Sequence, residues 1–439
     1  NHLSGALNRL GITLQRFKTG TPARVDARSL DFSKMTPQYG DEKIIPFSFM
    51  SGKLQRQQVP CFLTYTNEKT HEIIRQNIHR SPLYSGQIKG TGPRYCPSIE
   101  DKVVKFPDRE RHQLFIEPEG LSTNEMYVQG MSSSLPEEVQ IAFYRTVAGM
   151  ENVRFTRTAY AIEYDCIDPQ QLKLNLECRQ IAGLFMAGQI NGSSGYEEAG
   201  AQGIVAGINA VRYLQQQPPM VLGRDQAYAG VLIDDLVTKG TREPYRMMTS
   251  RAEYRLLLRQ DNADARLCQI GREMGLVGDA RYDRFMYKQE MVQKLKDKLE
   301  QTPAKAKVTL ALTGSEPNGP QKLADVLRRP GIKAGEVLTA AGEMELPDEE
   351  ILESLETEVK YEGYIQKQRQ QVEQFRALEN RKLPKNMDYM VMQGLRMEAR
   401  QKLQAAQPEN IGQAARISGV SPADISVLLV YFKKEHMSL

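Results

Sequence analysis

The sequence predicts an α/β region followed by a mostly α-helical region. Short runs of β-branched and aromatic residues gather in the first half of the 439-residue chain, and long runs rich in Glu, Lys, Gln, Arg, Leu and Met recur with helical spacing in the second half. Between them, Pro218 and Pro219 in LQQQPPM interrupt an apolar helical pattern. We therefore expect one domain over residues 1–216 and another over residues 217–439.

Each element of these regions follows from a local pattern. Apolar and β-branched runs predict strands at 113–118 (QLFIEP), 152–165 (NVRFTRTAYAIEYD) and 183–188 (GLFMAG). Stretches with little Gly or Pro predict helices at 279–301, 348–382 and 388–406. Residues 302–320 collect Pro, Gly, Ser and Asn, so we expect an exposed connection there.

The chain closes with a predicted helix that has a well-marked start. Ser421 suits the N-cap, Pro422 the first helical position and Asp424 the first turn. The following run, ISVLLVYF, is apolar enough to be buried. Two interpretations stay open: a helix that closes the core, and a helix that binds a partner.

Composition excludes some classes of protein and leaves others open. No apolar run approaches the roughly 18 residues that a spanning helix needs, which excludes a transmembrane protein. A count of 58 basic against 54 acidic residues gives a net charge of only +4, so a nucleic-acid surface would require local clusters. The cysteines are odd in number and form no CxxC motif, which predicts reduced cytoplasmic thiols and no metal site. They are Cys61, Cys96, Cys166, Cys178 and Cys268.

The segment 183–214 is the first candidate for chemistry. An apolar run ends at Gly188, a polar Gly-rich turn follows, and a helix begins near Glu197. Backbone N–H groups and the positive end of the helix would face an anionic or electron-rich group, and Gln189 could hydrogen-bond a hydroxyl or a ring edge. Tight packing of a strand on a helix explains the same pattern, and GxGxxG is missing from the chain. Both interpretations stay open.

The segment 92–120 offers a candidate nucleophile, Cys96, between Tyr95 and Pro97. Nearby cations favour its thiolate, and two carboxylates oppose it. These groups are Arg94, Lys102 and Lys105, and Glu100 and Asp101. A packed cysteine in a loop ordered by proline is the alternative.

The segment 238–267 carries arginines at helical spacing. Arg251, Arg255 and Arg259 recur every fourth residue and are predicted to share one helix face near Tyr254. Arginine forks and an aromatic ring suit phosphates and unstacked bases. Nearby carboxylates equally predict an ion-pair lattice within the chain.

Five long strings, spread over nearly the whole chain, resemble one family. They are FKTGTPARVD at 17–26, GPRYCPSIEDKVVKF at 92–106, AGQINGSSGYEEAGAQGIVAGINA at 187–210, TSRAEYRLLLRQDNADARL at 249–267 and ISGVSPADISVLLVYFKK at 417–434. The family is MnmG, also called GidA, whose members are FAD-dependent enzymes that modify the wobble uridine of certain tRNAs. Because the strings are long and occur in the family's order, a chance match is excluded.

The resemblance implies a fold and a set of binding residues. It implies an incomplete FAD/NAD-binding, Rossmann-like α/β domain with an inserted α/β region over 1–216, and a helical C-terminal domain over 217–439 that binds tRNA and a partner. The FAD-binding residues that it implies are Gln189, Asn191, Gly192, Gly195 and Tyr196. The NAD-binding residues that it implies are Gly92, Pro93, Arg94, Tyr95, Cys96, Pro97, Ser98, Ile99, Glu100, Asp101, Lys102, Val103, Val104, Lys105 and Phe106.

The resemblance also implies an activity. Members of the family act in the cytoplasm as homodimers that join the GTPase MnmE in a heterotetramer. Together they add an aminomethyl or carboxymethylaminomethyl group to C5 of the uridine, using methylenetetrahydrofolate, NADH, and glycine or ammonium. Cys96 resembles one of the two functional cysteines, and both a nucleophilic role at C6 of the uracil and a proton-transfer role are open to it.

The chain departs from the family's pattern at its start. It opens at Asn1 without Met, a secretory signal, the Gly-rich FAD fingerprint or the other functional cysteine. We expect that it is N-terminally truncated and that by itself it binds FAD poorly. Two alternatives remain, a folate- and FAD-dependent tRNA uracil methyltransferase and a non-catalytic remnant that binds tRNA or a partner. The helical half argues against the first, and the retained motifs argue against the second.

Overall fold

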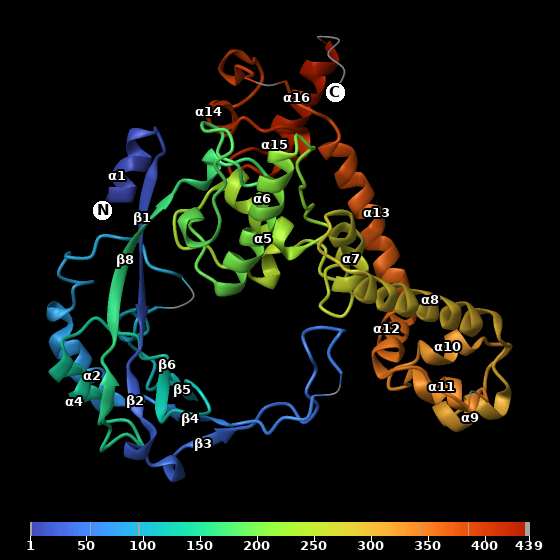
Figure 1. Cartoon of the computed structure of the whole chain (residues 1–439), viewed down its shortest axis with the longest axis horizontal. Helices are drawn as coiled ribbons and strands as arrows, with labels where there is room; N and C mark the ends of the chain where they lie inside the picture. Colours follow the sequence, from blue (N-terminus) through green and yellow to red (C-terminus); the bar gives the residue numbers. More distant parts are fainter. Residues whose placement is uncertain (1, 53, 95–96, 343, 385, 435–439) are drawn as a thin grey trace. The chain divides into compact units, whose positions relative to one another are not determined.

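A computed structural model describes residues 2–52, 54–94, 97–342, 344–384 and 386–434 (Figure 1). The chain forms two compact units. The first consists of Asn1–Ala206 and Gly240–Arg246, and the second of Gly207–Lys239 and Met247–Leu439. All named strands belong to the first unit, and the second is built from helices. This confirms the predicted fold class, while the two functional domains stay a prediction.

An antiparallel sheet of six strands, in the order β3-β4-β5-β6-β2-β7, forms much of the first unit. The strands are β2 (Arg24–Asp26), β3 (Thr36–Gln38), β4 (Cys61–Tyr65), β5 (Gln113–Pro118), β6 (Glu125–Gln129) and β7 (Phe155–Arg157). The predicted strand at 113–118 is β5. Its residues alternate between the two faces of the sheet, so Leu114 and Ile116 are buried together.

Helices cover the buried face of this sheet. They are α2 (Glu68–Asn77), α3 (Ile99–Lys105) and α4 (Glu137–Tyr144), and Figure 1 shows α2 and α4 side by side. Phe143 and Tyr144 of α4 are fully buried in the same apolar cluster as the sheet residues. The Tyr144 hydroxyl donates to the Met131 carbonyl (3.2 Å) and accepts from the Ala23 N–H (3.1 Å), so its burial leaves no polar atom unpaired.

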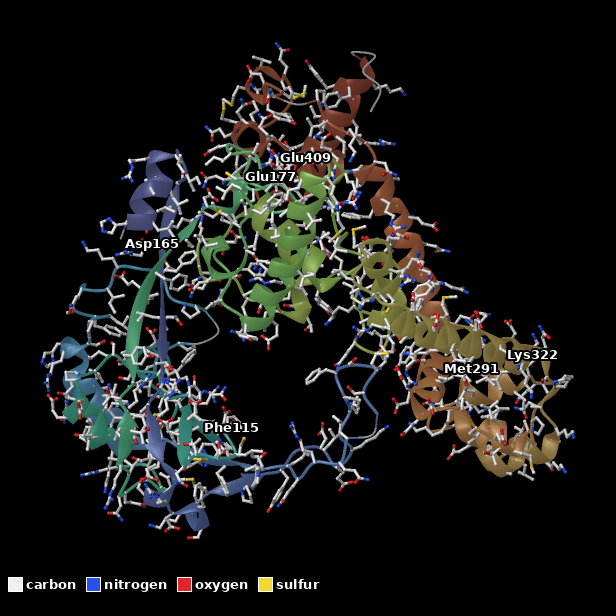
Figure 2. The ribbon with its side chains drawn as sticks, viewed as in Figure 1. Phe115, Asp165, Glu177, Met291, Lys322 and Glu409 are labelled. Carbon is white, nitrogen blue, oxygen red and sulfur yellow. The ribbon has the colours of Figure 1, made fainter. Side chains whose placement is uncertain are left out.

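Two long strands form a separate ribbon in the first unit (Figure 1). β1 (Leu14–Thr21) and β8 (Tyr160–Ile167) pair antiparallel along their whole length. Asp165 of β8, labelled in Figure 2, accepts hydrogen bonds from Arg16 (3.0 Å) and Ser4 (2.6 Å). The single strand predicted at 152–165 is therefore two, since β7 joins the six-stranded sheet and β8 joins the ribbon.

The strand predicted at 183–188 is reduced to one bridge, between Phe185 and Glu177 (Glu177 is labelled in Figure 2). The backbone turns out of the extended conformation at both ends of this run. Gly183 has φ +76° and Gly188 has φ +84°, values that glycine adopts without strain. Too few extended residues remain between them for a regular ladder.

The helices of the second unit match the predictions in part. Residues 279–301 form α8 as predicted. The predicted helix 348–382 is two helices, α12 (Glu349–Lys360) and α13 (Glu362–Glu379). Within 388–406 only η8 (Tyr389–Val391) and α14 (Met397–Ala406) are helical, because Gly394 adopts φ +90° and breaks the run.

Residues 302–320 are not the simple exposed connection that their composition predicts. They contain α9 (Ala306–Thr313), whose Val308 is buried with Leu299 of α8 and Leu323. Val308 and the partly buried Leu312 supply the apolar side of this short helix, whereas Leu310 is exposed. This cluster lies near Met291 and Lys322, which Figure 2 labels.

The last helix, α16 (Pro422–Lys434), begins as predicted. The Ser421 N–H donates to the Asp424 carboxylate (2.8 Å), and the Ser421 hydroxyl accepts from the Asp424 N–H (3.3 Å). Leu428 and Phe432 are fully buried, which confirms the core interpretation for one face of the helix. The partner-binding interpretation stays a prediction.

The remaining helices connect these parts. The α-helices are α1 (His2–Arg9), α5 (Tyr196–Leu214), α6 (Tyr228–Asp234), α7 (Ala263–Glu273), α10 (Leu323–Leu327), α11 (Ala334–Ala340) and α15 (Ile411–Arg416). The short segments are η1 (Ala27–Ser29), η2 (Phe32–Lys34), η3 (Ile78–Arg80), η4 (Pro169–Gln171), η5 (Gly188–Asn191), η6 (Asp235–Lys239) and η7 (Thr249–Arg251). In the described part of the chain, none of the helices combines the length and the apolarity that a membrane crossing requires.

Candidate functional site

A glycine turn at the start of α5 is the centre of the candidate site. Gly188 begins η5 with φ +84°, and Gly192 ends it with φ +81°. A Cβ on Gly192 would lie 3.0 Å from Cγ2 of Thr241 and 3.3 Å from the ring of Phe17. Both the backbone conformation and the available space therefore require glycine at position 192.

A buried glutamine, Gln202 of α5, holds the turn in place. Its Oε1 accepts from the Gly188 N–H (3.2 Å) and from the Asn191 side chain (2.9 Å). Its Nε2 donates to the Ser193 hydroxyl (2.8 Å) and to the Glu198 carbonyl (3.1 Å). Gln202 was not among the predicted site residues, although an amide side chain among the small residues at the start of a helix is a recognisable signal.

Residues 240–246 form the other wall of the turn. The Tyr245 N–H donates to the Gly192 carbonyl (2.8 Å), and the Ser194 N–H donates to the Tyr245 carbonyl (2.9 Å). These bonds make a short parallel bridge across more than 50 residues of chain. No local pattern near Tyr245 indicates this pairing, so the sequence did not predict it.

The predicted FAD residues divide into buried and exposed groups. Asn191, Gly192 and Gly195 are buried, whereas Gln189 and Tyr196 are exposed, the latter by 92%. Among the described residues, the side chains of Gln189 and Tyr196 have no hydrogen-bond partner. The Oδ1 atom of Asn191 is buried and likewise lacks a partner in the described part of the chain. The turn thus has polar groups that a ligand could satisfy.

The positive end of α5 faces a carboxylate of the same chain. The Glu198 carboxylate fills the space beside Gly195, where an added Cβ would overlap it. Arg246 lies 3.7 Å from this carboxylate. Because negative charge already compensates the helix end, the turn is better suited to a neutral, electron-rich ring than to a phosphate.

The second predicted segment, 92–106, surrounds a short helix. Residues Tyr95 and Cys96 lie outside the described residues, so the candidate nucleophile has no described geometry. After them, Ser98 caps α3 by accepting from the Asp101 N–H (3.2 Å). Ile99 and Val103 are buried in the core of the first unit, so these two side chains have a structural role.

Glu100 is the buried acid of this segment. Its Oε1 accepts from the Ser134 N–H (2.8 Å) and the Ser133 hydroxyl (3.0 Å), while Oε2 has no partner among the described residues. Burial raises the pKa of the Glu100 carboxyl, and these hydrogen bonds oppose that shift. The Glu100 carboxylate thus fastens the start of α3 to residues 133–134.

The outer side of the segment is exposed. Val104 and Phe106 are exposed by 46% and 53%, and Arg94 and Lys105 are exposed as well. Lys102 instead turns inward, donating to the Gly130 carbonyl (3.0 Å). The described members of the predicted NAD segment therefore include core residues and a solvent-facing strip.

Strand β1 brings the two predicted segments together. A Cβ on Gly90 would lie 2.7 Å from the Phe17 backbone, and the Lys18 N–H donates to the Thr91 carbonyl (3.0 Å). The ring of the same Phe17 lies against Gly192. From β8, Glu163 accepts from the Gly90 N–H (2.7 Å). The ribbon thus joins residues 90–92 to the glycine turn.

Three of the described cysteines are poor nucleophiles. Cys166 lies near the turn, but burial, together with nearby Asp165 and Asp168, raises the pKa of its thiol to about 12. Burial also raises the thiol pKa of Cys61 and of Cys268. A thiol with a raised pKa is protonated at neutral pH and reacts slowly.

The predicted arginine helix over 251–259 does not form. Only η7 is helical there, and α7 begins at Ala263. Side chains take the carbonyls that a helix would use: Asn262 donates to the Leu257 carbonyl (3.0 Å) and Arg266 to the Arg259 carbonyl (2.8 Å). The three arginines therefore do not share a helix face.

An ion-pair lattice is what these residues and their neighbours build. Arg259 pairs with Asp261 at 3.0 Å. Arg224, almost fully buried, pairs with Asp234 (2.9 Å), Asp235 (2.8 Å) and Glu253 (2.7 Å). Arg255, in contrast, is exposed and has no partner among the described residues. For Arg259, therefore, the predicted ion pair within the chain is the interpretation that the structure supports.

Comparison with known proteins places these features in a family. The family model described as Glucose inhibited division protein A matches residues 1–218. Two models of the MnmG/GidA C-terminal region match further along the chain, the helical domain at residues 279–369 and the helical bundle at residues 371–438. The chain belongs to the MnmG/GidA family. The resemblance inferred from its motifs is confirmed.

The similar proteins cover nearly the whole chain. A curated relative from Lachnoclostridium phytofermentans, named tRNA uridine 5-carboxymethylaminomethyl modification enzyme MnmG, is 58% identical over 99% of this chain and 70% of its own length. One with the same name from Clostridium botulinum is 57% identical over 99% of this chain and 71% of its own length. A solved structure of Aquifex aeolicus GidA, in its form II crystal, is 45% identical and matches with a TM-score of 0.87 over 98% of this chain and 69% of that one.

Proposed function

We propose that this MnmG/GidA chain takes part in FAD-dependent modification of tRNA, adding an aminomethyl or carboxymethylaminomethyl group to C5 of the wobble uridine. The observation that carries the proposal is the position of Phe17, which lies against both the glycine turn and residues 90–92. Two segments more than 90 residues apart, each with unused polar or exposed groups, thereby meet on one strand. The names of the relatives support the same activity.

The glycine turn fits the flavin end of FAD. Gly188 and Gly192 let the backbone approach a flat ring, and the unpaired groups of Asn191, Gln189 and Tyr196 are available to its polar edge. Glu198 disfavours the pyrophosphate at this helix end, so that part of FAD would be held elsewhere. Bound FAD supplies reversible redox chemistry, and this chain's turn orients the ring.

Residues 92–106 are proposed to bind NADH and to carry the reacting cysteine. The exposed strip with Val104, Lys105 and Phe106 supports a ligand-facing surface. Burial raises the thiol pKa of Cys61, Cys166 and Cys268, and Cys178 is buried at 1% exposure, so we take Cys96 as the candidate. Its thiolate would add to C6 of the uracil ring and make C5 nucleophilic, or its thiol would transfer a proton. Methylenetetrahydrofolate is the proposed carbon source.

Residues 217–439 are proposed to bind tRNA and the GTPase MnmE, within a homodimer that acts in the cytoplasm. The two family models that match there support a conserved architecture for this region. These matched helical domains, and relatives that share the name MnmG, favour this function over the uracil methyltransferase. They equally favour an enzyme over a non-catalytic remnant.

Visible spectroscopy of the purified protein, extended at its N-terminus to the length of its relatives, tests the flavin assignment. We expect flavin absorption bands and their bleaching by NADH. A colourless protein that ignores added FAD would contradict the proposal.

Replacement of the cysteine tests the chemical step separately. Cys96→Ser in the extended protein should abolish uridine modification while the flavin spectrum stays unchanged. Cys61→Ser is the matched control, because its thiol pKa is raised, and it should retain activity. Full activity of Cys96→Ser would exclude both roles proposed for this thiol.

A further inference from the structure

A buried ion pair joins the C-terminal helical bundle to the segment that precedes the wall of the glycine turn. Arg416 of α15 donates to the two carboxylate oxygens of Asp234, from Nη2 (2.6 Å) and from Nε (2.8 Å). Both side chains are almost fully buried, at 9% and 5% exposure. α15 lies inside the stretch that the helical-bundle family model matches, and Figure 1 shows it beside α6, which ends at Asp234. Two parallel bonds from one guanidinium fix the orientation of the two groups as well as their distance.

The segment that Arg416 contacts is also held by ion pairs of its own. Arg224 binds Asp234 (2.9 Å) and the next residue, Asp235 (2.8 Å), which also accepts from Lys239 (2.7 Å). Asp235 and Lys239 are the first and last residues of η6, which is a π-helix. The two ends of η6 are therefore tied to each other, and Arg416 is bonded to the residue just before it.

This fixed segment continues directly into residues 240–246, the wall of the glycine turn. Gly240 follows Lys239 with φ +68°, and an added Cβ there would lie only 3.1 Å from a neighbouring side chain. A few residues later, the Tyr245 N–H donates to the Gly192 carbonyl (2.8 Å). Because only five residues separate Lys239 from Tyr245, and the first of them is itself confined, the position of η6 limits where the wall can lie.

Stability alone does not account for this arrangement. Buried ion pairs contribute little net stability compared with apolar packing, and the Nη1 atom of Arg416 is buried without a partner among the described residues. π-Helices are rare and occur frequently at functional sites. A need to hold η6 in one position explains the geometry better.

We infer that Arg416 is a positioning residue for the glycine turn. Through Asp234 it fixes η6 and the wall that follows, so a displacement of the C-terminal bundle alters the surroundings of the flavin. The inference rests on the function proposed above, and it gives the helical region a means of regulating the redox site.

Hydrogen exchange followed by mass spectrometry tests the contact in the N-terminally extended protein, first without FAD. Arg416→Gln should speed exchange of the amides of residues 240–246 at least tenfold, because the wall loses its support. Arg416→Lys keeps the charge beside Asp234 but not the two parallel bonds, and it should speed the same amides by a smaller factor. The matched control is Arg396→Gln, which breaks another ion pair of the same bundle, with Asp424 (2.6 Å), and should leave residues 240–246 as in the wild type.

The amides of strand β5, in the core of the first unit, separate a local effect from unfolding. They should exchange equally slowly in all variants, and if Arg416→Gln also loosens β5, the comparison is made with Arg416→Lys. Flavin titration then measures the consequence for the site. Arg416→Gln should raise the FAD dissociation constant at least threefold and change the visible circular dichroism of the bound flavin, and Arg396→Gln should do neither.

Three results would overturn the inference. They are unchanged exchange at residues 240–246 in both Arg416 variants, an equal change in Arg396→Gln, and faster exchange combined with a normal flavin affinity and spectrum. Faster exchange at residues 240–246 in a protein whose wild-type form binds no flavin is a different result. It would contradict the proposed redox function and still support the positioning role of Arg416.

Discussion

Two polar motifs predict ligand binding, the glycine turn of the first unit and the arginine segment of the second. They differ in whether their polar side chains already have partners within the chain. In the turn, Gln202 bonds the Gly188 N–H and the Ser193 hydroxyl, while Gln189 and Tyr196 stay at the surface without partners among the described residues. In the arginine segment, Arg259 pairs with Asp261, whereas Arg255 is exposed without a described partner. A polar side chain of a motif therefore stays available to a ligand only where other residues form the hydrogen bonds and ion pairs that hold the motif in place.

The largest expected effect is a loss of stability when Arg224 is removed from the ion-pair lattice of the second unit. Arg224→Ala should lower the free energy of unfolding by about 3–5 kcal/mol, because it leaves buried carboxylates without their cation. Thermal or urea unfolding measures the loss. Arg255→Ala is the control, and because Arg255 is exposed without a described partner it should change stability by less than about 0.5 kcal/mol. Equal effects of the two variants would show that the lattice is not structural.

The next effect concerns the backbone of the turn. Gly192→Ala should cost about 2–4 kcal/mol, because its left-handed conformation and its contacts with Thr241 and Phe17 disfavour a Cβ. Flavin affinity should fall as well. Gly200→Ala is the control: it lies within α5 with open space around it and should stabilise by roughly 0.5–1 kcal/mol. A stable Gly192→Ala protein with normal flavin content would remove the turn from the site.

Smaller effects distinguish the residue that stabilises the turn, Gln202, from a residue proposed to bind the flavin, Gln189. Gln202→Leu should cost about 1–3 kcal/mol, because the Gly188 N–H and the Asn191 amide lose their acceptor. Gln189→Leu should leave the melting temperature unchanged and weaken flavin binding, since its side chain is exposed. Differential scanning calorimetry and flavin titration distinguish the two. Loss of stability in Gln189→Leu would contradict the division of roles.

The smallest effect is a pH dependence of the first unit. Burial, with positive charge from His71, Lys102 and Arg109, lowers the pKa of His112 to about 4, below its unfolded value near 6.5. The unfolded chain therefore takes up the proton first, and stability should fall as pH drops from about 6.5 towards 4.

Melting temperatures between pH 4 and 8 measure this dependence. His112→Gln should reduce the slope in that window, and the remaining slope should come from His71, whose pKa burial also lowers. His79→Gln, which changes an exposed histidine, should leave the curve as in the wild type. A wild-type curve without any slope below pH 6.5 would show that His112 takes up its proton as readily in the folded chain as in the unfolded chain, contrary to the expectation.

Much of the fold was readable from local patterns. Residues 113–118 and 279–301 form the predicted strand and helix, and Ser421 with Pro422 starts the last helix. These predictions succeed because pleat alternation, helical spacing and capping depend on residues within a few positions of each other. The strand predicted at 183–188 fails because turns at Gly183 and Gly188 leave it almost no partner.

The candidate site was readable only in part. The glycines of the turn were found because positive φ favours one residue type. Gln202, Tyr245 and Glu198 were missed because their roles depend on partners that local patterns do not specify. The arginine helix was predicted wrongly because spacing alone does not reveal that Asn262 and Arg266 take its backbone carbonyls.

The sequence by itself determined the fold class, an α/β region followed by a helical region, and the family. It also determined the positions where glycine or a helix cap was required, since these depend on short-range sterics or on long continuous strings. The tertiary structure decided which polar side chains are still free. Hydrogen bonds and ion pairs are formed by whichever groups folding brings within about 3 Å, and those groups come from distant parts of the chain. Phe17 is the clearest example, because it lies against both Gly90 and Gly192, and no local sequence pattern reveals that it brings these two segments together.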